Sequence, residues 1–338
     1  TVDGLADPMP GVEVLAASHP VPDRRGEAAA REALRRAEAL GPHDRLVALV
    51  SGGASALLPA PVAGVPLDDK IEVNRLLLRS GADIGETNLV RQSLSRIKGG
   101  GLARAAAPAP VTALILSDVV GDDLRVVASG PTAPALGDGA RAADLLRRLG
   151  LWEDLPASVR AHLTEQGSVP PEPVHADNRL VGSNGLSLEA MARGRPGAQI
   201  VAPLVGDVGL AAKRVLAHWP EPGGAVLFGG ETTVRVAGGG LGGRNQELAL
   251  RVALVLEERG GAGDWVFLSG GTDGRDGPTD AAGGLVDPET LARMRAASVD
   301  PHAALARNDS YHALQASGDL IRMAPTGTNV ADLQVLLR

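Results

Sequence analysis

The segment Gly238–Glu247, GGGLGGRNQE, combines a glycine-rich loop with a cation at the start of a helix-like run. Three of its glycines, ending at Gly243, fit the G-x-G-x-x-G spacing of dinucleotide-binding folds. In those folds an acidic residue about 20 positions further on binds the ribose. Here the next strand-end acid, Asp273, follows Gly243 by 30 residues. We therefore interpret the glycine match as coincidental, and Arg244 as a cation placed for an oxyanion or a transferring phosphoryl group.

A second glycine-rich turn, SGGAS at Ser51–Ser55, directly follows a predicted buried strand. Consecutive small residues allow backbone N–H groups to converge on an anion, and a helix N-terminus would add its dipole. An ordinary strand-to-helix turn is the alternative, and the segment is not a Walker A loop because no G-K-[ST] follows. The anion-binding candidates in this turn are Ser51, Gly52, Gly53 and Ser55.

Basic side chains follow in Asn88–Gly101, NLVRQSLSRIKGGG. Arg91, Ser95 and Lys98 are spaced by three or four residues, which predicts that they share one face of a short helix. Lysine is rare here, since only three of the 33 basic residues are lysines. A solvated basic face and an anion-binding role are equally good interpretations of this segment.

Acidic side chains follow two other predicted strands. Asp118 and Asp122 lie in SDVVGDD and suit Mg²⁺, which binds through one or two carboxylates together with phosphate and water; capping of a turn is the alternative. In TDGRDGPTDA, Asp273 stands at a predicted strand end. The spacing of this segment fails as an EF-hand loop, so a general base or a Mg²⁺ ligand is the better interpretation of Asp273.

The elements that must position these loops alternate between strand-like and helix-like runs. Strands are predicted at 45–50, 111–116 and 264–268, with weaker candidates near 179–181 and 198–205. Helices are predicted at 26–41, 70–81, 140–150, 209–219 and 287–298. Such alternation predicts βαβ units and parallel sheets with helices on both faces, with ligands at the carboxyl ends of the strands.

The bulk composition narrows the possible functions. The 338 residues favour two domains, and 44% apolar residues suffice for buried cores. A net charge of −7 argues against nonspecific nucleic-acid binding, and no apolar run is long enough to predict a membrane span. The absence of cysteine excludes thiolate chemistry and fits a cytoplasmic setting. The Pro-rich segment 165–178 is the best linker candidate, and the start at Thr1 suggests an incomplete N-terminus.

Taken together, these motifs resemble the glycerate 2-kinases whose C-terminal part is the MOFRL domain, some of which are labelled hydroxypyruvate reductases. Each motif alone is modest, but ten in this order are highly specific. The matching segments are SHPVPD, LVSGGASALL, NLVRQSLSRIKGGGLA, LILSDVVGDD, ASGPT, GGETTVRV, GGRNQELAL, SGGTDGRDGPTDAAGG, RNDSY and PTGTNVADL.

The resemblance implies two three-layer α/β/α domains with largely parallel sheets, at 1–220 and 221–338, and an active-site cleft between them. It implies ATP- and Mg²⁺-dependent phosphorylation of D-glycerate to 2-phosphoglycerate, with a homodimer as a possible assembly. Arg244 would lie at the catalytic centre, and Asp273 would accept or orient the proton of the C2 hydroxyl. Asp118, Asp122 or Glu231 would help to hold Mg²⁺, and Arg91, Lys98 or Ser51 would bind the carboxylate of glycerate. Further candidate contacts to substrate or phosphate are Gly229, Gly230, Thr232, Gly243, Asn245, Thr326, Thr328 and Asn329.

Two departures from the family pattern accompany the resemblance. Family members carry an active-site lysine on a glycine-rich turn ahead of the equivalent of Thr1, and no residue here takes that role. Met323 and Ala324 stand where the family usually has Thr-Gly. Two other functions remain open: an NAD(P)H-dependent hydroxypyruvate reductase and a catalytically inactive protein that binds sugar acids.

Overall fold

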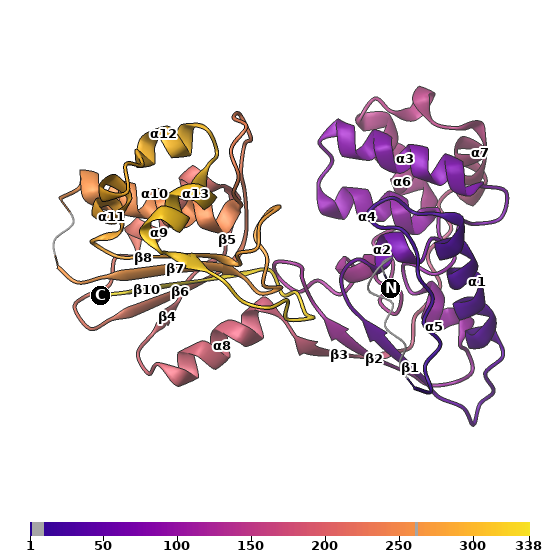
Figure 1. Ribbon diagram of the computed structural model, residues 1–338. Helices are drawn as coiled ribbons and strands as arrows, with labels where there is room; N and C mark the ends of the chain where they lie inside the picture. Colours follow the sequence, from indigo (N-terminus) through magenta and orange to yellow (C-terminus); the bar gives the residue numbers. More distant parts are fainter. Residues whose placement is uncertain (2–9, 261–262) are drawn as a thin grey trace. The chain divides into compact units, whose positions relative to one another are not determined.

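The computed structural model describes residues 1, 10–260 and 263–338, which form two compact units (Figure 1). Unit 1 comprises residues 1–117 and 122–181, and unit 2 comprises residues 118–121 and 182–338. The chain therefore changes unit just after the Pro-rich segment 165–178 and earlier than the predicted boundary at residue 220. The reason is that the strands and helices between 182 and 220 pair with, or pack on, the sheet of unit 2.

Unit 1 contains a three-stranded sheet in the order β1 (Leu46–Val50), β2 (Val111–Leu116) and β3 (Asp177–Gly182). The first two strands are parallel, as the sequence predicts. Alternate residues of β1 differ sharply in environment, because Ala48 and Val50 are buried whereas Val47 and Leu49 are 55% and 79% exposed. Figure 1 shows the helices of unit 1 on one side of this sheet. In the described residues, unit 1 thus has two layers where three were predicted.

The helices of unit 1 form a core of their own beside the sheet. Four of them, α3 (Leu67–Ser80), α4 (Ile84–Ser93), α6 (Gly139–Arg148) and α7 (Ala157–Gln166), contribute leucines and valines to one buried cluster. Helix α4 begins with a capping box between Asp83 and Glu86. The remaining elements of the unit are α1 (Arg24–Glu38), α2 (Ala54–Leu57), α5 (Gly101–Ala105) and two short 3₁₀ turns at Val127–Ser129 and Trp152–Asp154.

Unit 2 is built on a seven-stranded sheet in the order β4-β6-β10-β7-β8-β9, with β5 also pairing with β6. The apolar runs near 198–205 and 264–268 form strands, as predicted. The strand bounds are β4 Gln199–Ile200, β5 Leu204–Asp207, β6 Ala225–Thr233, β7 Val266–Gly271, β8 Gly283–Val286, β9 Leu320–Ile321 and β10 Asp332–Leu337.

Helices cover both faces of this sheet, so unit 2 has the predicted three layers. Figure 1 shows α8 on one face and the other helices on the opposite face. The larger core lies beneath the second group and includes Phe228, Leu250, Phe267 and Met294. The helix bounds are α8 Asn184–Gly194, α9 Val208–Ala217, α10 Arg244–Glu258, α11 Thr290–Ala296, α12 Pro301–Ala306 and α13 Ser310–Ser317.

The α/β class is confirmed, but the strand directions in unit 2 need a correction. β4 and β5 run parallel to β6, whereas β10 pairs antiparallel with both β6 and β7, and β7-β8-β9 are also antiparallel. The expectation of a largely parallel sheet failed because the last strand was not recognised. Strand β10 inserts at the sheet centre in the reverse direction and brings its first residue to the carboxyl ends of β6 and β7.

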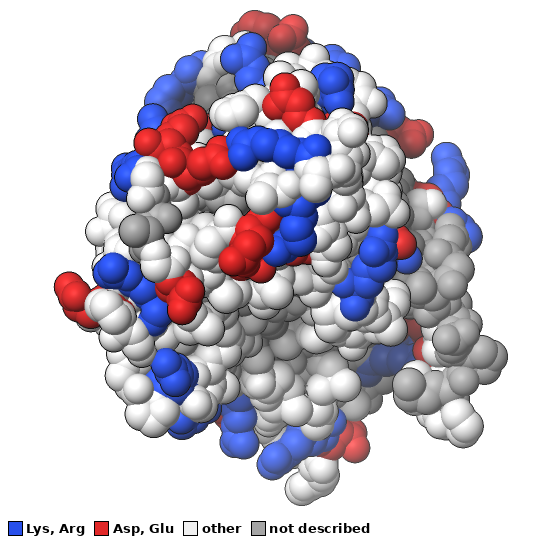
Figure 2. All heavy atoms as spheres, turned by 60° about the vertical axis from the view of Figure 1, so that its left-hand side comes forward, with Lys and Arg blue, Asp and Glu red and all other residues white. Residues whose placement is uncertain are grey.

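Two surface properties agree with the composition. Figure 2 shows basic and acidic side chains interspersed over the face in view, without a broad patch of one sign. Within the described ranges, none of the helices has both the length and the apolar character needed to cross a membrane.

Candidate functional site

The antiparallel course of β10 creates a polar cluster at one edge of the sheet of unit 2. Asp332, the first residue of β10, lies opposite Gly230 of β6 and Gly271 of β7. Glu231 follows Gly230 near the end of its strand, and Asp273 follows Gly271 by two residues. Acids from three segments far apart in the sequence therefore gather at the predicted place, the carboxyl ends of neighbouring strands.

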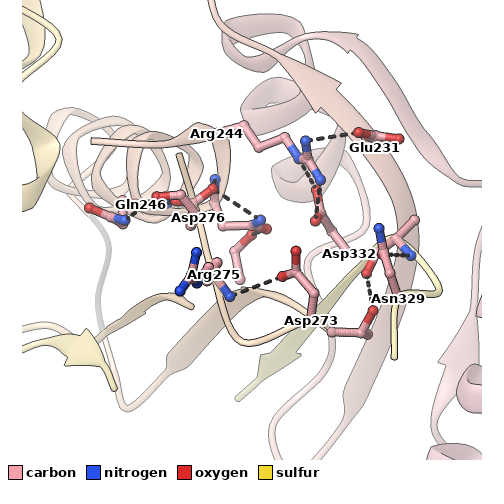
Figure 3. Close-up of polar contacts among 12 residues, drawn as sticks. Glu231, Arg244, Gln246, Asp273, Arg275, Asp276, Asn329 and Asp332 are labelled. Atoms are coloured by element: carbon pink, nitrogen blue, oxygen red, sulfur yellow. Dashed lines mark hydrogen bonds and ion pairs between the residues drawn. The ribbon is translucent and has the colours of Figure 1, made fainter. Parts of the chain in front are cut away.

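Arg244, the first residue of α10, lies between two of these acids (Figure 3). Its Nε and one Nη donate to the two carboxylate oxygens of Asp332 at 2.6 and 3.0 Å, and its other Nη lies 2.8 Å from Glu231 Oε1. Burial alone would lower the pKa of Arg244, but the hydrogen bonds and attraction of Asp332 and the charge of Glu231 outweigh it and raise the pKa. The bidentate pair fixes the plane of the guanidinium, and about a third of its side chain stays exposed.

The rest of the cluster is rich in negative charge. Burial raises the pKa of Glu231, and the charges of Asp332, Asp118 and Asp273 raise it further, against the opposing effect of Arg244. Burial also raises the pKa of Asp118. Asp273 accepts a hydrogen bond from the backbone N–H of Arg275 at 2.9 Å through one oxygen. This surplus of carboxylates would be relieved by a bound cation.

The predicted metal trio is only partly assembled. The segment containing Asp118 belongs to unit 2, where this side chain interacts with Glu231. Asp122 belongs to unit 1 and has a left-handed backbone, φ 53°, directly after Gly121 at φ 87°. One of its carboxylate oxygens is buried without a hydrogen-bond partner. Within the described part of the chain, no group of three or more acidic or histidine side chains is arranged to hold a metal ion.

A further carboxylate, that of Asp276, occupies the N-terminus of α10. Gly243 is the N-cap residue and offers no side chain, but Asp276 accepts from the backbone N–H of Asn245 at 3.1 Å and of Gln246 at 2.8 Å. Burial raises the pKa of Asp276 to about 6 in spite of these hydrogen bonds. The helix terminus that would bind a pyrophosphate in a dinucleotide fold thus already has an internal anion.

The glycines of the opening loop are explained by packing. A methyl group at Gly238 would collide with the carbonyl oxygen of Arg307, and one at Gly243 would collide with the Asp276 carboxyl group. Asn308 and Asp309 accept hydrogen bonds from the same loop. The RNDSY segment therefore accounts for Gly238 and the close packing of Asp276 accounts for Gly243, so the G-x-G-x-x-G spacing arises from packing within unit 2.

Several other candidates in unit 2 have structural positions. Thr232 is buried, on the strand face opposite Glu231. Asn245 is buried and accepts from Ser269 Oγ at 2.6 Å. A methyl group at Gly229 would collide with Asn184, and one at Gly230 with Leu204. The structure therefore gives no support for direct ligand contacts by the side chains of Thr232 and Asn245, because polar atoms or packing already surround them.

The PTGTN loop lies beside the acidic cluster. Thr326 Oγ1 donates to the carbonyl oxygen of Thr272 at 2.7 Å, and Thr326 N donates to the carbonyl oxygen of Asp273 at 3.2 Å. Asn329 Oδ1 accepts from Ala331 N at 2.9 Å (Figure 3). Thr326, Thr328 and Asn329 are all exposed, so their outer polar atoms can reach a ligand as well as shape the turn.

In unit 1, the SGGAS turn joins β1 to the four-residue helix α2 and passes through Gly53 at φ 81°. Ser51 is exposed, whereas Ser55 is half-buried. Lys98 Nζ donates to the carbonyl oxygen of Ser55 at 2.9 Å and also contacts its hydroxyl, so this lysine holds the turn in place. The anion-binding prediction for the turn stays a prediction.

Arg91 and Lys98 line one cavity of unit 1, but not as the sequence predicts. Helix α4 ends at Ser93, and a separate turn follows Leu94, so Lys98 is not on the helix that carries Arg91. The predicted single helix through Gly101 is wrong, because the chain turns at Ser95–Lys98 and crosses Gly99 and Gly100 with positive φ. A third cation, Lys70 of α3, lines the same cavity.

Three polar residues central to these regions were missed from the sequence: Lys70, Asp276 and Asp332. Asp332 is completely buried, in a strand that is otherwise mostly apolar, and a lone acid in such a run is a usable signal. Asp276 lies in TDGRDGPTDA, a segment in which the sequence predicted a role for Asp273 alone. Lys70 had a compositional signal, because lysine is so rare in this chain.

Comparisons with known proteins give a consistent picture. Residues 2–164 match a family described as a domain of unknown function, DUF4147, and residues 224–332 match the MOFRL family. An Agrobacterium vitis relative with the provisional name hydroxypyruvate reductase is 43% identical over 99% of this chain and 79% of its own length. The D-glycerate 2-kinase of Thermotoga maritima is 39% identical over 96% of this chain and 80% of its own. The crystal structure of the Thermotoga maritima glycerate kinase matches with a TM-score of 0.89, 38% identity, and coverage of 98% of this chain and 82% of that chain.

Proposed function

Because the chain belongs to the glycerate 2-kinase family with a C-terminal MOFRL domain, we propose that it transfers the γ-phosphoryl group of ATP to the 2-hydroxyl of D-glycerate. The products would be 2-phosphoglycerate and ADP. The observation that carries this proposal is Arg244, held by the buried Asp332 beside Glu231 and Asp273 at the strand ends. Phosphoryl transfer requires a fixed cation near the phosphate and a carboxylate near the attacking hydroxyl, and both kinds of group are present here.

In the proposed reaction, Arg244 stabilises the negative charge that develops on the transferring phosphoryl group. Its bidentate pairing with Asp332 leaves the third guanidinium nitrogen beside the half-exposed Glu231 carboxylate. A guanidinium held in this way needs little rearrangement when the charge appears. Asp332 thus orients the guanidinium of Arg244, and the ligand would bind beside Glu231.

Asp273 is the proposed proton acceptor. The C2 hydroxyl oxygen of glycerate forms a bond to the γ-phosphorus, the bond between that phosphorus and the bridging oxygen of ADP breaks, and the hydroxyl proton passes to the Asp273 carboxylate. Among the described residues, one oxygen of Asp273 accepts a hydrogen bond, from the backbone N–H of Arg275. The other oxygen is available to the hydroxyl.

The acidic surplus around Arg244 fits a divalent cation. Asp118 and Glu231 both have raised pKa values, and Glu231 is raised in part by neighbouring carboxylates. Mg²⁺ needs only one or two protein carboxylates when phosphate oxygens and water complete its shell, so a cluster of three acids is not required. Bound there, Mg²⁺ would neutralise phosphate charge. We assign Asp118 and Glu231 to it and leave Asp122 as the third candidate.

Recognition of the acid substrate is assigned to unit 1. Arg91 and Lys98 line a cavity there, and Ser51 is exposed on the adjoining SGGAS turn. These side chains can pair with the carboxylate of glycerate. The glycine-rich turn would contribute backbone N–H groups to the same anions. We also infer a cytoplasmic setting, in which ATP is available.

The alternative is an NAD(P)H-dependent hydroxypyruvate reductase, which the provisional name of the Agrobacterium vitis relative favours. The N-terminus of α10 argues against a reductase, because the Asp276 carboxylate already accepts hydrogen bonds from the N–H groups that a pyrophosphate would need. A catalytically inactive sugar-acid-binding protein would keep the unit 1 cavity but lack turnover.

The deciding experiment is a turnover assay with D-glycerate, ATP and Mg²⁺, in which the phosphoglycerate isomer is identified by NMR. Formation of 2-phosphoglycerate is the expected result. Oxidation of NADH with hydroxypyruvate, without a phosphorylated product, would establish the reductase instead. Binding of glycerate with neither activity would identify the inactive protein.

A further inference from the structure

One cavity in unit 1 is lined by three cationic side chains. Its volume is about 240 Å³, and Lys70, Arg91 and Lys98 come to it from α3, α4 and the turn that follows α4. His19 and Gly53 contribute to its polar lining, and the apolar lining comes from residues such as Leu77 and Leu94. Two of the three lysines of the whole chain meet here.

Every hydrogen-bond partner of these cations in the described residues is electrically neutral. Lys70 Nζ donates to the carbonyl oxygens of Leu94 at 2.9 Å and Arg91 at 3.3 Å. Arg91 donates to Asn74 Oδ1 at 2.8 Å. Lys98 donates to Ser55, as described above. No carboxylate of the described chain forms an ion pair with any of the three.

The nearest carboxylate in sequence is already engaged elsewhere. Asp69, next to Lys70 on α3, accepts a hydrogen bond from the Ser158 hydroxyl of α7. Helix α7 also brings His162 to this region, where its ring contacts the carbonyl oxygen of Ser93. The charge that acts on Lys70 from α4 is that of Arg91, and Lys98 in the following turn is acted on by both Lys70 and Arg91, all of the same sign.

Such an arrangement is costly without a ligand. Lys70 and Lys98 are 8% and 3% exposed. Burial, reinforced by the charge of Arg91, lowers the pKa of Lys70 to about 7. Burial, with the charges of Lys70 and Arg91, also lowers the pKa of Lys98 well below its usual range. An uncompensated buried charge destabilises a fold by several kcal/mol, and apolar residues of similar size could fill the space. An anion in the cavity would remove this penalty.

We propose that Lys70 acts with Arg91 and Lys98 in a carboxylate subsite within this cavity, and that Lys70 makes the subsite selective for small hydroxy acid anions. This inference rests on the proposed function and adds a specificity residue to it. The cavity volume suits a three-carbon acid, and its apolar lining suits a short carbon chain better than a triphosphate. Lysine also fits the task because its compact ammonium changes protonation readily when buried.

Calorimetry on the whole protein, without nucleotide, tests the subsite directly. We expect D-glycerate to bind, and the uncharged analogue D-glyceraldehyde to bind at least about tenfold more weakly, since a charge-assisted hydrogen bond is lost. In K70M the preference for the acid should fall by about tenfold or more. The matched control is K213M, which removes the third lysine, exposed on α9, and should change nothing.

Proton uptake provides a measurement that a merely structural lysine would not affect. An anion beside Lys70 raises the lysine pKa from about 7, so binding near pH 8 should take up part of a proton. The number of protons taken up follows from the difference in observed binding enthalpy between titrations in two buffers of different ionisation enthalpy. This number should fall to zero in K70M. Wild-type protein suffices to detect it, so the test survives if K70M does not fold.

The outcomes separate this proposal from the kinase proposal. Unchanged glycerate affinity in folded K70M, or no proton uptake by wild-type protein, overturns the role of Lys70 even if the kinase reaction occurs. Lys70-dependent binding of glycerate supports the subsite even if no phosphorylation is seen. Lys70-dependent binding of inorganic phosphate, with none of glycerate, would overturn the carboxylate assignment.

Discussion

Arg244 in unit 2 and Lys98 in unit 1 are both cations beside glycine-rich turns, but they have different kinds of partner. Arg244 forms a bidentate pair with a fully buried aspartate and contacts a second acid. Lys98 and its neighbours Lys70 and Arg91 bond only to carbonyl, amide and hydroxyl oxygens among the described residues. The cation of unit 2 is thus paired with acids of its own unit, whereas the cations of unit 1 lack a counter-charge among the described residues.

This difference separates two uses of buried charge. In unit 2, the arginine and Asp332 depend on each other, so a substitution there disturbs both the fold and the chemistry. In unit 1, removal of one cation removes its repulsion with the other two, so the fold should tolerate the change. The affinity for an anion should fall. Substitutions in the two units test this contrast.

Arg244→Ala should lower kcat by about 1,000-fold or more, because the cation on the transferring phosphoryl group is lost. The same change leaves Asp332 as an unpaired buried carboxylate and should destabilise the protein by about 3–5 kcal/mol. Steady-state kinetics and thermal unfolding check the two effects.

The double variant R244A/D332N distinguishes the loss of activity in Arg244→Ala from its loss of stability. Without a buried carboxylate to leave unpaired, it should recover much of the lost stability but none of the activity. Wild-type-like turnover in this folded variant would exclude Arg244 from the reaction. Recovery of neither stability nor activity would show that the pair orders the strand ends themselves.

Asp273→Asn should lower kcat by about 100-fold or more while changing stability little, because the group is half-buried and forms one hydrogen bond to backbone. The matched control is Asp280→Asn in the same loop, where the acid is exposed and pairs with Tyr311 and Arg322. Equal activity losses in the two variants would indicate a general loop effect instead of proton transfer.

Asp276→Asn should flatten the dependence of stability on pH. The folded-state pKa of about 6 exceeds the ordinary value of 3.8, so the folded protein binds this proton more tightly than the unfolded chain. The contribution is therefore fully favourable below about pH 4 and is lost as pH rises to about 6, a change of about 3 kcal/mol. Urea unfolding of wild type and variant between pH 4 and 7 measures the difference. A wild-type slope in the variant would contradict it.

The sequence predicted much of the fold because short apolar runs and Ala-rich helices are local signals. The strands at 45–50 and 111–116 and the helices at 26–41 and 140–150 agree with β1, β2, α1 and α6 within a few residues. The predicted helix extended beyond the end of α4 at Ser93, because the helical spacing of Arg91, Ser95 and Lys98 continues past the turn. Periodicity alone could not distinguish a helix from a turn there.

The site could be predicted only as far as its local parts. Arg244, Glu231 and Asp273 stand in recognisable glycine-rich motifs. Their grouping depends on β10, which enters the sheet centre from the end of the chain and places Asp332 opposite Gly230 and Gly271. Likewise, the approach of Lys70 to Arg91 depends on the packing of α3 on α4. Contacts between residues so far apart in the sequence produce no recognisable local pattern.

The smallest predicted effect separates the stability of α4 from the charge of the unit 1 cavity. Asp83→Ala removes the capping box in which Asp83 and Glu86 exchange hydrogen bonds of 2.8 and 3.1 Å. The loss should lower the free energy of unfolding by about 1 kcal/mol. Arg91 lies in the last turn of the same helix, far from the cap, so the KM for D-glycerate should not change.

Asp138→Ala, which removes the cap of α6, is the matched control, because its residue does not line the cavity and the expected loss of stability is similar. If both cap variants lose about 1 kcal/mol and keep the wild-type KM, the effect of K70M on glycerate binding reflects charge. If Asp83→Ala alone raises the KM as much as K70M does, the cavity responds to the stability of its helix. The contrast between an internally paired cation in unit 2 and ligand-dependent cations in unit 1 would then fail.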